Sequence, residues 1–212
     1  AVYNGRAVTL DGAVSLEGIL RNGWITVITR NDPHCYYSYR DETLGFEYEM
    51  ASAFARFLGV RLRIVVLSNW ENMVPALQNR TADLIAAGMV MPSGSGNQPA
   101  ASRGILDIRQ HAVVHRVHRP IRSPKDLEGM DVHVSMNTAH HRRMLELQRE
   151  GIAMHIHTHD HVPAEELIQM VADGRIEATI AYSHVARLAR RYHPQIAVAA
   201  PVSPEISLNW AV

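Results

Sequence analysis

GFEYEMASAFARFLGVRL (residues 45–62) and ADLIAAGM (residues 82–89) are the stretches that decide the fold. The first predicts an amphipathic helix, because its large apolar residues recur at helical spacing and form one stripe: Phe46, Met50, Phe54, Phe57 and Leu58. Gly59 supplies the left-handed residue that ends such a helix. Residues 60–66 and 82–87 read as strands, so helix and strand alternate as in an α/β protein.

Composition narrows the class of protein. The chain has 212 residues, which suits one large domain or two small lobes. Its 21 basic and 21 acidic residues cancel, so no overall field attracts it to nucleic acid or to an anionic membrane. No apolar run is long enough to cross a bilayer, and no leader is visible at Ala1. A leader peptide can have been removed already, so the sequence is compatible with an exported protein.

The first half of the chain begins with a segment of weak pattern. Residues 1–20 read as a loosely structured extension, because glycines interrupt any period. A buried strand at 24–29 and a turn at 31–33 follow. Ser68 and Glu71 fit a capping box for a helix that turns Met73, Val74 and Leu77 inward. Residues 92–101, rich in Gly, Ser, Asn and Pro, predict an irregular loop.

The second half repeats this order. The pattern predicts a crossing strand at 110–117, a short capped helix at 123–129, strands at 131–135, 154–158 and 178–181, and helices at 139–150 and 163–172 and through Tyr192. Asn79 and Gly174 each end a helix at a position that tolerates positive φ, and an arginine and a strand follow both. Two related lobes would explain this repeated pattern. The helix-ending and turn signals that occur in any α/β unit would explain it equally well.

We therefore expect three parts: an extension at 1–20, a first lobe at 21–112 and a second lobe at 113–212. The last segment contains a strand pattern, because Ile206, Leu208, Trp210 and Val212 alternate with small or polar residues. That strand, near 206–212, is expected to return to the first lobe.

Three stretches resemble bacterial extracellular solute-binding proteins of family 3. They are GFEYEMA with FLGV (45–51 and 57–60), ADLIAAG (82–88), and YHPQIAVA with LNW (192–199 and 208–210). The last is typical of the branch whose solute-binding module precedes a peptidoglycan-cleaving lytic transglycosylase domain. The resemblance implies a two-lobed α/β fold of the periplasmic-binding-protein type II kind, with a ligand cleft between the lobes. It also implies an exported, periplasmic protein, associated with the outer membrane if it belongs to that branch.

The family also implies further helices after the return strand. In solute-binding proteins those helices complete the first lobe, and they are absent here, so we expect the chain to be a segment of a longer protein. As a substitute cover we expect the extension or a second copy of the chain, since a bare apolar surface promotes association. The covering residues would be Leu10, Val14, Leu16, Ile19 and Leu20.

The family's two ligand anchors are missing. Amino-acid binders hold the ligand carboxylate with an arginine after the Ala-Gly-Met motif and the ammonium with an aspartate after a second-lobe strand. The corresponding positions here are Ser95 and Tyr182. A zwitterion that leaves water needs both charges paired, so the resemblance argues against an ordinary free amino acid as ligand.

The remaining candidate ligand-binding residues are polar or aromatic and mostly uncharged. They are Asn31, Tyr36, Tyr37, Trp70, Gly88, Met89, Ser95, Asn137, Thr138 and Tyr182. Aromatic faces beside amide and hydroxyl groups suit a sugar, a muropeptide or a small heterocycle. The helix that opens after Asn137 offers N–H groups to an anion or a carbonyl. Lobe packing is the other interpretation of Tyr36, Trp70 and Tyr182.

The histidines are the compositional oddity, 13 in all. In the strand MHIHTHDH (154–161), His155 and His157 would face one way and could meet at one metal ion. A solvent-facing strand edge explains them better, because a zinc site normally adds a distant cysteine or histidine pair. We expect no metal site, no cofactor and a protein that is stable without metal. Cys35 is expected to pack rather than to react.

The sequence thus predicts a ligand-binding module without catalytic residues, the sensory part of a peptidoglycan lytic transglycosylase. Its partners would be a small ligand, the carboxy-terminal catalytic domain of the parent protein and a second copy of the chain. One alternative is a free transport receptor for a non-zwitterionic solute, which would keep a complete lobe and its anchors. The other is an enzyme on the same scaffold, such as a dehydratase, which would need a buried acid or base in the cleft.

Overall fold

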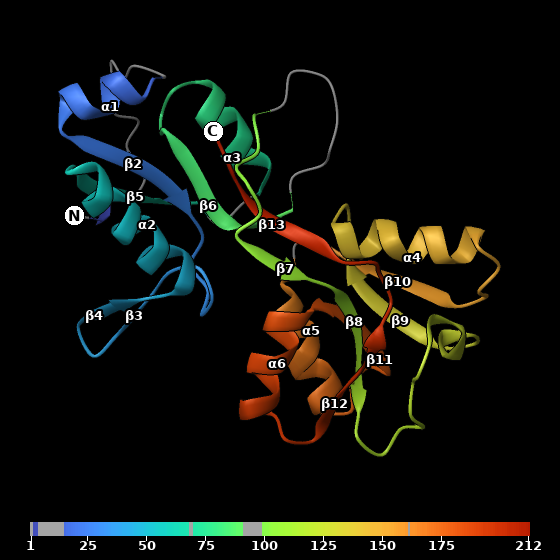
Figure 1. The fold of residues 1–212 in the computed structure, drawn as a ribbon. Coiled ribbons are helices and arrows are strands. Elements are labelled where there is room, and N and C mark those ends of the chain that lie inside the picture. The colour runs from blue at the N-terminus through green and yellow to red at the C-terminus, as the bar shows by residue number, and fades with distance from the viewer. Residues whose placement is uncertain (1, 4–14, 68–69, 91–98, 161) are drawn as a thin grey trace. The chain divides into compact units, whose positions relative to one another are not determined.

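The computed structural model describes residues 2–3, 15–67, 70–90, 99–160 and 162–212 (Figure 1). The chain forms two compact units. Unit 1 comprises Ala1–Leu106 with Ser207–Val212, and unit 2 comprises Asp107–Ile206. The chain therefore passes from one unit to the other twice. The first passage lies at residues 106–107, earlier than the lobe boundary expected after residue 112, which falls inside strand β8 (Gln110–His115).

Unit 1 is built on a six-stranded sheet in the order β1-β5-β2-β6-β13-β7. Its strands are β1 (Val2–Tyr3), β2 (Trp24–Thr29), β5 (Arg61–Val66), β6 (Leu84–Met89), β7 (Leu106–Ile108) and β13 (Ile206–Ala211). Strands β1, β5, β2 and β6 run parallel, and β13 is antiparallel to β6. The unit also contains α1 (Leu16–Asn22), α2 (Phe46–Leu58), α3 (Trp70–Gln78) and a hairpin of β3 (Tyr37–Tyr39) and β4 (Glu42–Leu44).

Helices cover both faces of this sheet, which explains why its central strands are apolar throughout. On one face α2 packs against a cluster that includes Val27, Leu84 and Trp210. On the other face Met73 of α3 packs against a cluster with Ile85 and Ala211. In β13, Leu208 and Trp210 are buried and Asn209 between them is partly exposed, as the alternation predicts. The prediction is wrong at the end of the strand, where Ala211 is buried in the cluster with Met73 and Val212 is exposed.

The packing face of α2 differs from the one that the apolar stripe suggested. Its buried residues are Glu47, Ala51 and Ala55, whereas Phe46, Met50, Phe54 and Phe57 are exposed. Small alanines bring the helix close to the sheet, so the larger side chains lie on its flank. Glu47 is only 1% exposed, and two N–H groups donate hydrogen bonds to its carboxylate. These bonds offset the cost of burying the acid.

The described residues of the amino-terminal extension contain regular structure, strand β1 and the start of helix α1, where a loosely structured segment was expected. Helix α1 is capped by Ser15, whose hydroxyl accepts the Gly18 N–H at 3.2 Å. Three of the residues expected to cover the first lobe lie in the described part of the extension. Ile19 is partly buried and packs against the core cluster on the sheet face that α2 covers, but Leu16 and Leu20 are exposed. The covering role expected of these two leucines is therefore wrong. Leu10 and Val14 lie outside the described residues.

Unit 2 is built on a five-stranded sheet in the order β10-β9-β11-β8-β12. Its remaining strands are β9 (Asp131–Ser135), β10 (His155–His159), β11 (Ala178–Tyr182) and β12 (Ile196–Pro201), and its helices are η1 (Pro124–Leu127), α4 (Ala139–Arg149), α5 (Ala164–Ala172) and α6 (Ser183–Tyr192). Strands β10, β9 and β11 run parallel, while β8 is antiparallel to β11 and β12. Met144 and Leu147 of α4 fill one face, and α5 and α6 fill the other with Leu167 and Val185.

Several local signals are confirmed. The helix at 46–58 ends at Gly59 with φ of 69°, and Ser123 and Asp126 form the capping box of η1. Gly174 has positive φ as expected, but in the first half the positive φ falls on Arg80 (59°) and not on Asn79. Ser68 and most of the loop at 92–101 lie outside the described residues. Among the helices that the structure describes, none has the length and apolar character needed to span a bilayer.

Candidate functional site

In unit 1 the first group of candidate residues lies in the loop after β2. Asn31 and Tyr36 form an isolated bridge, and Asp32 and Tyr36 exchange two backbone hydrogen bonds of 3.1 Å. The carboxylate of Asp32 accepts the N–H groups of His34 and Cys35 at 2.7 and 2.8 Å and forms an ion pair with Arg30. The loop is thus held from within, and Asn31 is exposed at its rim.

The two tyrosines of this loop differ in their surroundings. The rings of Tyr36 and Tyr48 form a T-shaped pair with centroids 5.6 Å apart, and Tyr36 packs against the core cluster that contains Val27, Leu84 and Trp210. This contact supports the packing interpretation of Tyr36. Tyr37 is half-buried and begins β3, where it pairs with Leu44.

The amino terminus of α2 is bonded to the same loop. The N–H groups of Glu47 and Tyr48 donate to the carbonyls of His34 and Cys35. Gly45 caps the helix with φ of 135°, and a Cβ there would collide with the Cys35 carbonyl. Because these amides are already bonded, α2 offers no anion site through them. Burial raises the pKa of the Cys35 thiol well above its usual range, in agreement with a packing role.

Gly88 lies near the end of β6 in a left-handed conformation, with φ of 64°. Its N–H donates to Glu47 Oε1 at 2.9 Å, so a ligand would have to meet this residue through other atoms. Met89 ends β6, where its backbone pairs with Asn209, and Trp70 begins α3. Ser95 lies outside the described residues.

In unit 2 the candidates gather where parallel strands end. Asn137 has φ of 61° and turns the chain from β9 into α4. The hydroxyl of Thr138 accepts the His141 N–H at 3.2 Å and donates to the Ser135 carbonyl at 2.7 Å. Thr138 is therefore the N-cap of α4, as its position suggested. The carboxyl ends of parallel strands are where α/β proteins commonly bind ligands.

Tyr182, the last residue of β11, lies close to two imidazoles. Its ring lies 4.4 Å from that of His140 and 6.0 Å from that of His184, the latter nearly parallel. His140 is buried, and its Nδ1 lies 3.0 Å from Gln110 Oε1, which fixes the ring. Tyr182, the predicted counterpart of the family's aspartate, is thus part of an aromatic group, His140–Tyr182–His184.

His140 and His184 were not among the predicted site residues. The spacing offers a signal for each: His140 is the second residue of a helix that opens at a strand end, and His184 follows Tyr182 by two positions. Their contact with Tyr182 depends on the packing of α4, β11 and α6, which no local pattern reveals.

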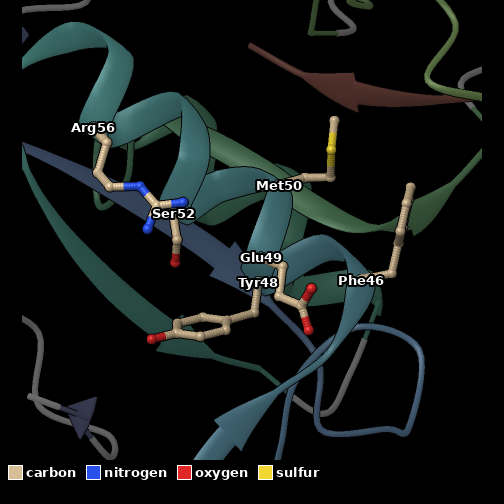
Figure 2. A pocket seen from close by; sticks show the side chains of 6 residues that line it. All are labelled: Phe46, Tyr48, Glu49, Met50, Ser52 and Arg56. Atoms are coloured by element: carbon tan, nitrogen blue, oxygen red, sulfur yellow. The ribbon is translucent and has the colours of Figure 1, made fainter.

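Two open hollows lie on the separate units. One, of about 510 Å³, is on α2 and is lined by Phe46, Tyr48, Glu49, Met50, Ser52 and Arg56 (Figure 2). The other, of about 300 Å³, lies in unit 2 and contains Arg109 and Arg187 together with Asp107, Ser183 and Glu205. Arg109 is already paired there with Glu205 at 3.2 Å. Of the candidate residues that the structure describes, none lines either hollow.

The histidine strand β10 is an edge strand whose side chains meet those of β9. His157 Nε2 lies 2.9 Å from Asp131 Oδ1, and this contact lowers the pKa of Asp131. The His157 ring stacks on His133 at 4.6 Å, and His133 Nδ1 lies 2.9 Å from His159 Nε2. Burial lowers the pKa of His133, and the neighbouring imidazoles lower it further. Within the described residues, no three or more His, Cys, Asp or Glu side chains are arranged to hold a metal ion.

Comparison with known proteins relates this chain to a protein family. Residues 25–120 match the family model for bacterial extracellular solute-binding proteins, family 3. The chain is 38% identical over 198 residues to a membrane-bound lytic murein transglycosylase F from Desulfosudis oleivorans, a match that covers 93% of this chain and 43% of that protein. The chain contains a family 3 solute-binding domain. A transglycosylase F from Stutzerimonas stutzeri is 33% identical, with 93% of this chain and 41% of that protein covered.

The solute-binding domain spans about two fifths of the length of these curated relatives, and it corresponds to their solute-binding part rather than to their catalytic domain. Solved structures confirm the predicted fold class. An ancestral amino acid-binding protein, a precursor of cyclohexadienyl dehydratase, superposes with a TM-score of 0.78 at 24% identity, covering 93% of this chain and 85% of that one. An ancestral arginine-binding protein bound to arginine gives 0.76 at 22% identity, covering 90% and 84%.

Proposed function

We propose that this domain is the ligand-sensing part of a periplasmic peptidoglycan lytic transglycosylase. The observation that carries the proposal is the 38% identity to a membrane-bound lytic murein transglycosylase F along nearly the whole chain. In such a protein the domain would act beside a carboxy-terminal catalytic domain. Ligand would regulate that partner only through a difference in affinity between two conformations of the solute-binding domain.

The aromatic group His140–Tyr182–His184 favours a ligand that has no positive charge at the place where an amino acid has its ammonium group. A free amino acid offers an ammonium, and at the predicted position of the family's aspartate this domain has the phenol of Tyr182 close to two imidazoles. Ring faces and hydroxyl groups suit a sugar ring or a muropeptide, which presents apolar C–H surfaces and many hydroxyls. We therefore propose a muropeptide or another sugar-like ligand that contacts Tyr182, Asn137 and Thr138.

Calorimetric titration with soluble muropeptides tests this proposal. Tyr182→Ala should weaken binding at least about tenfold, whereas Tyr182→Phe should keep most of the affinity, because stacking needs the ring and not the hydroxyl. Tyr192→Ala is the matched control, since Tyr192 is an exposed tyrosine at the other end of α6. The absence of binding to any muropeptide, or equal loss in the Tyr182 and Tyr192 variants, would contradict the proposal.

A free transport receptor for a non-zwitterionic solute is the alternative role. The likeness to amino acid-binding proteins supports it through the fold alone. The two roles differ in what ligand does to catalysis. In a sensing domain, ligand changes the cleavage rate of a full-length protein that carries both domains, and Tyr182→Ala abolishes that change. A full-length enzyme whose rate ignores ligand would favour transport.

We further propose that the chain associates with a second copy through its first unit.

A further inference from the structure

Helix α2 presents a row of large apolar side chains that the core of unit 1 does not use. Phe46, Met50 and Phe54 are 37%, 38% and 36% exposed, and Phe57 is 84% exposed. The opposite side of the helix, with Ala51 and Ala55, is the one packed on the sheet. An apolar row of this size on one exposed helix indicates an interaction surface.

Three residues of this row, together with Ala53, have the spacing of a coiled-coil seam. Phe46, Met50, Ala53 and Phe57 follow one another at steps of four, three and four residues, and all four are exposed. Alternating steps of three and four place side chains along one line that a second helix can cover. Phe54 lies beside this line and leans on the Trp210 ring at a centroid distance of 6.0 Å, so it joins the seam to the core.

The charges beside the seam indicate which helix could cover it. Glu49 and Arg56 are seven residues apart and therefore lie on the same flank of the seam. They are about 10 Å apart along the helix axis, too far to pair with each other. If a second α2 lies antiparallel to the first, Glu49 of each copy comes near Arg56 of the other. A parallel arrangement would set equal charges at equal heights.

The apolar residues obey the same symmetry. In the antiparallel arrangement that pairs the charges, Phe46 lies opposite Phe57 of the second copy at both ends. Met50 lies opposite Ala53 at the centre, so a large side chain meets a small one. A two-fold interface uses the same patch on both copies, and such a patch must complement itself, as this one does.

We propose that two copies of this chain associate through antiparallel pairing of their α2 helices. The hollow on α2 shown in Figure 2 contains both Glu49 and Arg56, and it would be filled on association. A helix of 13 residues supplies a contact below the usual size of a stable interface, so the dimer is weak and depends on protein concentration. The inference uses unit 1 alone and does not depend on the ligand.

Analytical ultracentrifugation of the whole chain at concentrations up to about 200 μM, well above a micromolar dissociation constant, tests the pairing. The unaltered chain should dimerise reversibly. Phe57→Glu should remain monomeric with an unchanged melting temperature, because that side chain contributes little to the monomer's core. Glu42→Arg, an exposed charge change on β4, is the control and should leave dimerisation unaffected.

Charge exchange makes the test specific for the antiparallel arrangement. Glu49→Arg and Arg56→Glu should each weaken dimerisation, because each sets like charges opposite one another across the two-fold axis. The double exchange should restore it to within about threefold of the original constant, less than the tenfold that one strong contact changes. A chain that stays monomeric throughout, a dimer that survives Phe57→Glu, or a double exchange no better than the single ones would overturn the proposal.

Discussion

Trp210 Nε1 donates a 2.6 Å hydrogen bond to Glu47 Oε2, joining the last strand of unit 1 to its second helix across 163 positions of sequence. The other carboxylate oxygen of Glu47 accepts the Gly88 N–H at 2.9 Å. A buried acid thus connects α2, β6 and β13. Both of its oxygens are acceptors, and both donors would be left without a partner if it were lost.

Glu47→Gln should destabilise the fold. A glutamine side chain has one oxygen and one NH2 group, so it can satisfy only one of the two N–H donors. The other donor is left unsatisfied in the interior, which costs about 1–3 kcal/mol. Urea unfolding measures this loss. Glu49→Gln, on the exposed side of the same helix, is the control and should change the free energy of unfolding by less than about 0.5 kcal/mol. Equal stability of the two variants would contradict this role.

The same residue predicts a pH dependence of stability. Burial raises the pKa of Glu47, although hydrogen bonds from Trp210 and Gly88 oppose the shift. The folded state then binds more protons than the unfolded state between the unfolded pKa, about 4.3, and the higher folded one. The stability that the protonated Glu47 contributes is fully present below the unfolded pKa. It is lost as pH rises through the folded pKa. The stability difference between the original chain and Glu47→Gln should shrink across this window, and a difference that grew with pH would refute the shift.

The extension contributes through one side chain. Ile19→Ala should lower the free energy of unfolding by about 1–2 kcal/mol, because Ile19 is partly buried and packs against the core cluster on the sheet face that α2 covers. Leu20→Ala, the exposed neighbour, should cost less than about 0.5 kcal/mol. Thermal denaturation of the two variants side by side provides the comparison. If Leu20 proved the costlier loss, α1 would pack on its other face.

Free amino acids should bind poorly. From the sequence we predict that Ser95 and Tyr182 take the positions at which the family's amino-acid binders have an arginine and an aspartate, so neither charge of a zwitterion would have its usual partner. Calorimetry with the standard amino acids is the measurement. A dissociation constant of about 1 μM or tighter for any of them, equivalent to about −8 kcal/mol, would show that other residues supply the charges.

Metal removal should leave the fold intact. His157 is engaged with Asp131 and stacked on His133, and these contacts need no metal ion. We expect the same melting temperature with and without a chelator and no stoichiometric zinc by elemental analysis. A large drop in melting temperature with chelator would mean that these imidazoles hold a structural metal.

The alternation of helices and strands, and with it the α/β class, could be predicted from sequence because periodicity is a local property. Strand 24–29 agrees residue by residue, and helix α2 ends at Gly59 as predicted. The packing face of α2 could not be predicted, because the rule that large apolar residues face the core fails where alanines let a helix approach closely. Burial of Glu47 depends on donors from β6 and β13, which are distant in the chain.

The candidate site shows the same division. Asn137 and Thr138 could be located because a strand end and a helix cap are local signals, and Thr138 does cap α4. The contacts of Tyr182 with His140 and His184 are tertiary, so only its position in the sequence was visible beforehand. Whether these residues touch a ligand stays a prediction until the variants are tested.

Unit 2 is inserted within unit 1, and this order affects how the chain emerges from the ribosome. Asp107–Ile206 is one continuous segment, so all of its strands are present before β13 has been made. Unit 1 lacks β13 until residues 206–211 have been made, and until then Glu47 cannot bond to Trp210. Domains generally fold as units while the chain is made. Unit 2 should therefore complete its fold before unit 1 does. The hydrogen bond between Trp210 and Glu47 can form only when β13 joins the sheet of unit 1.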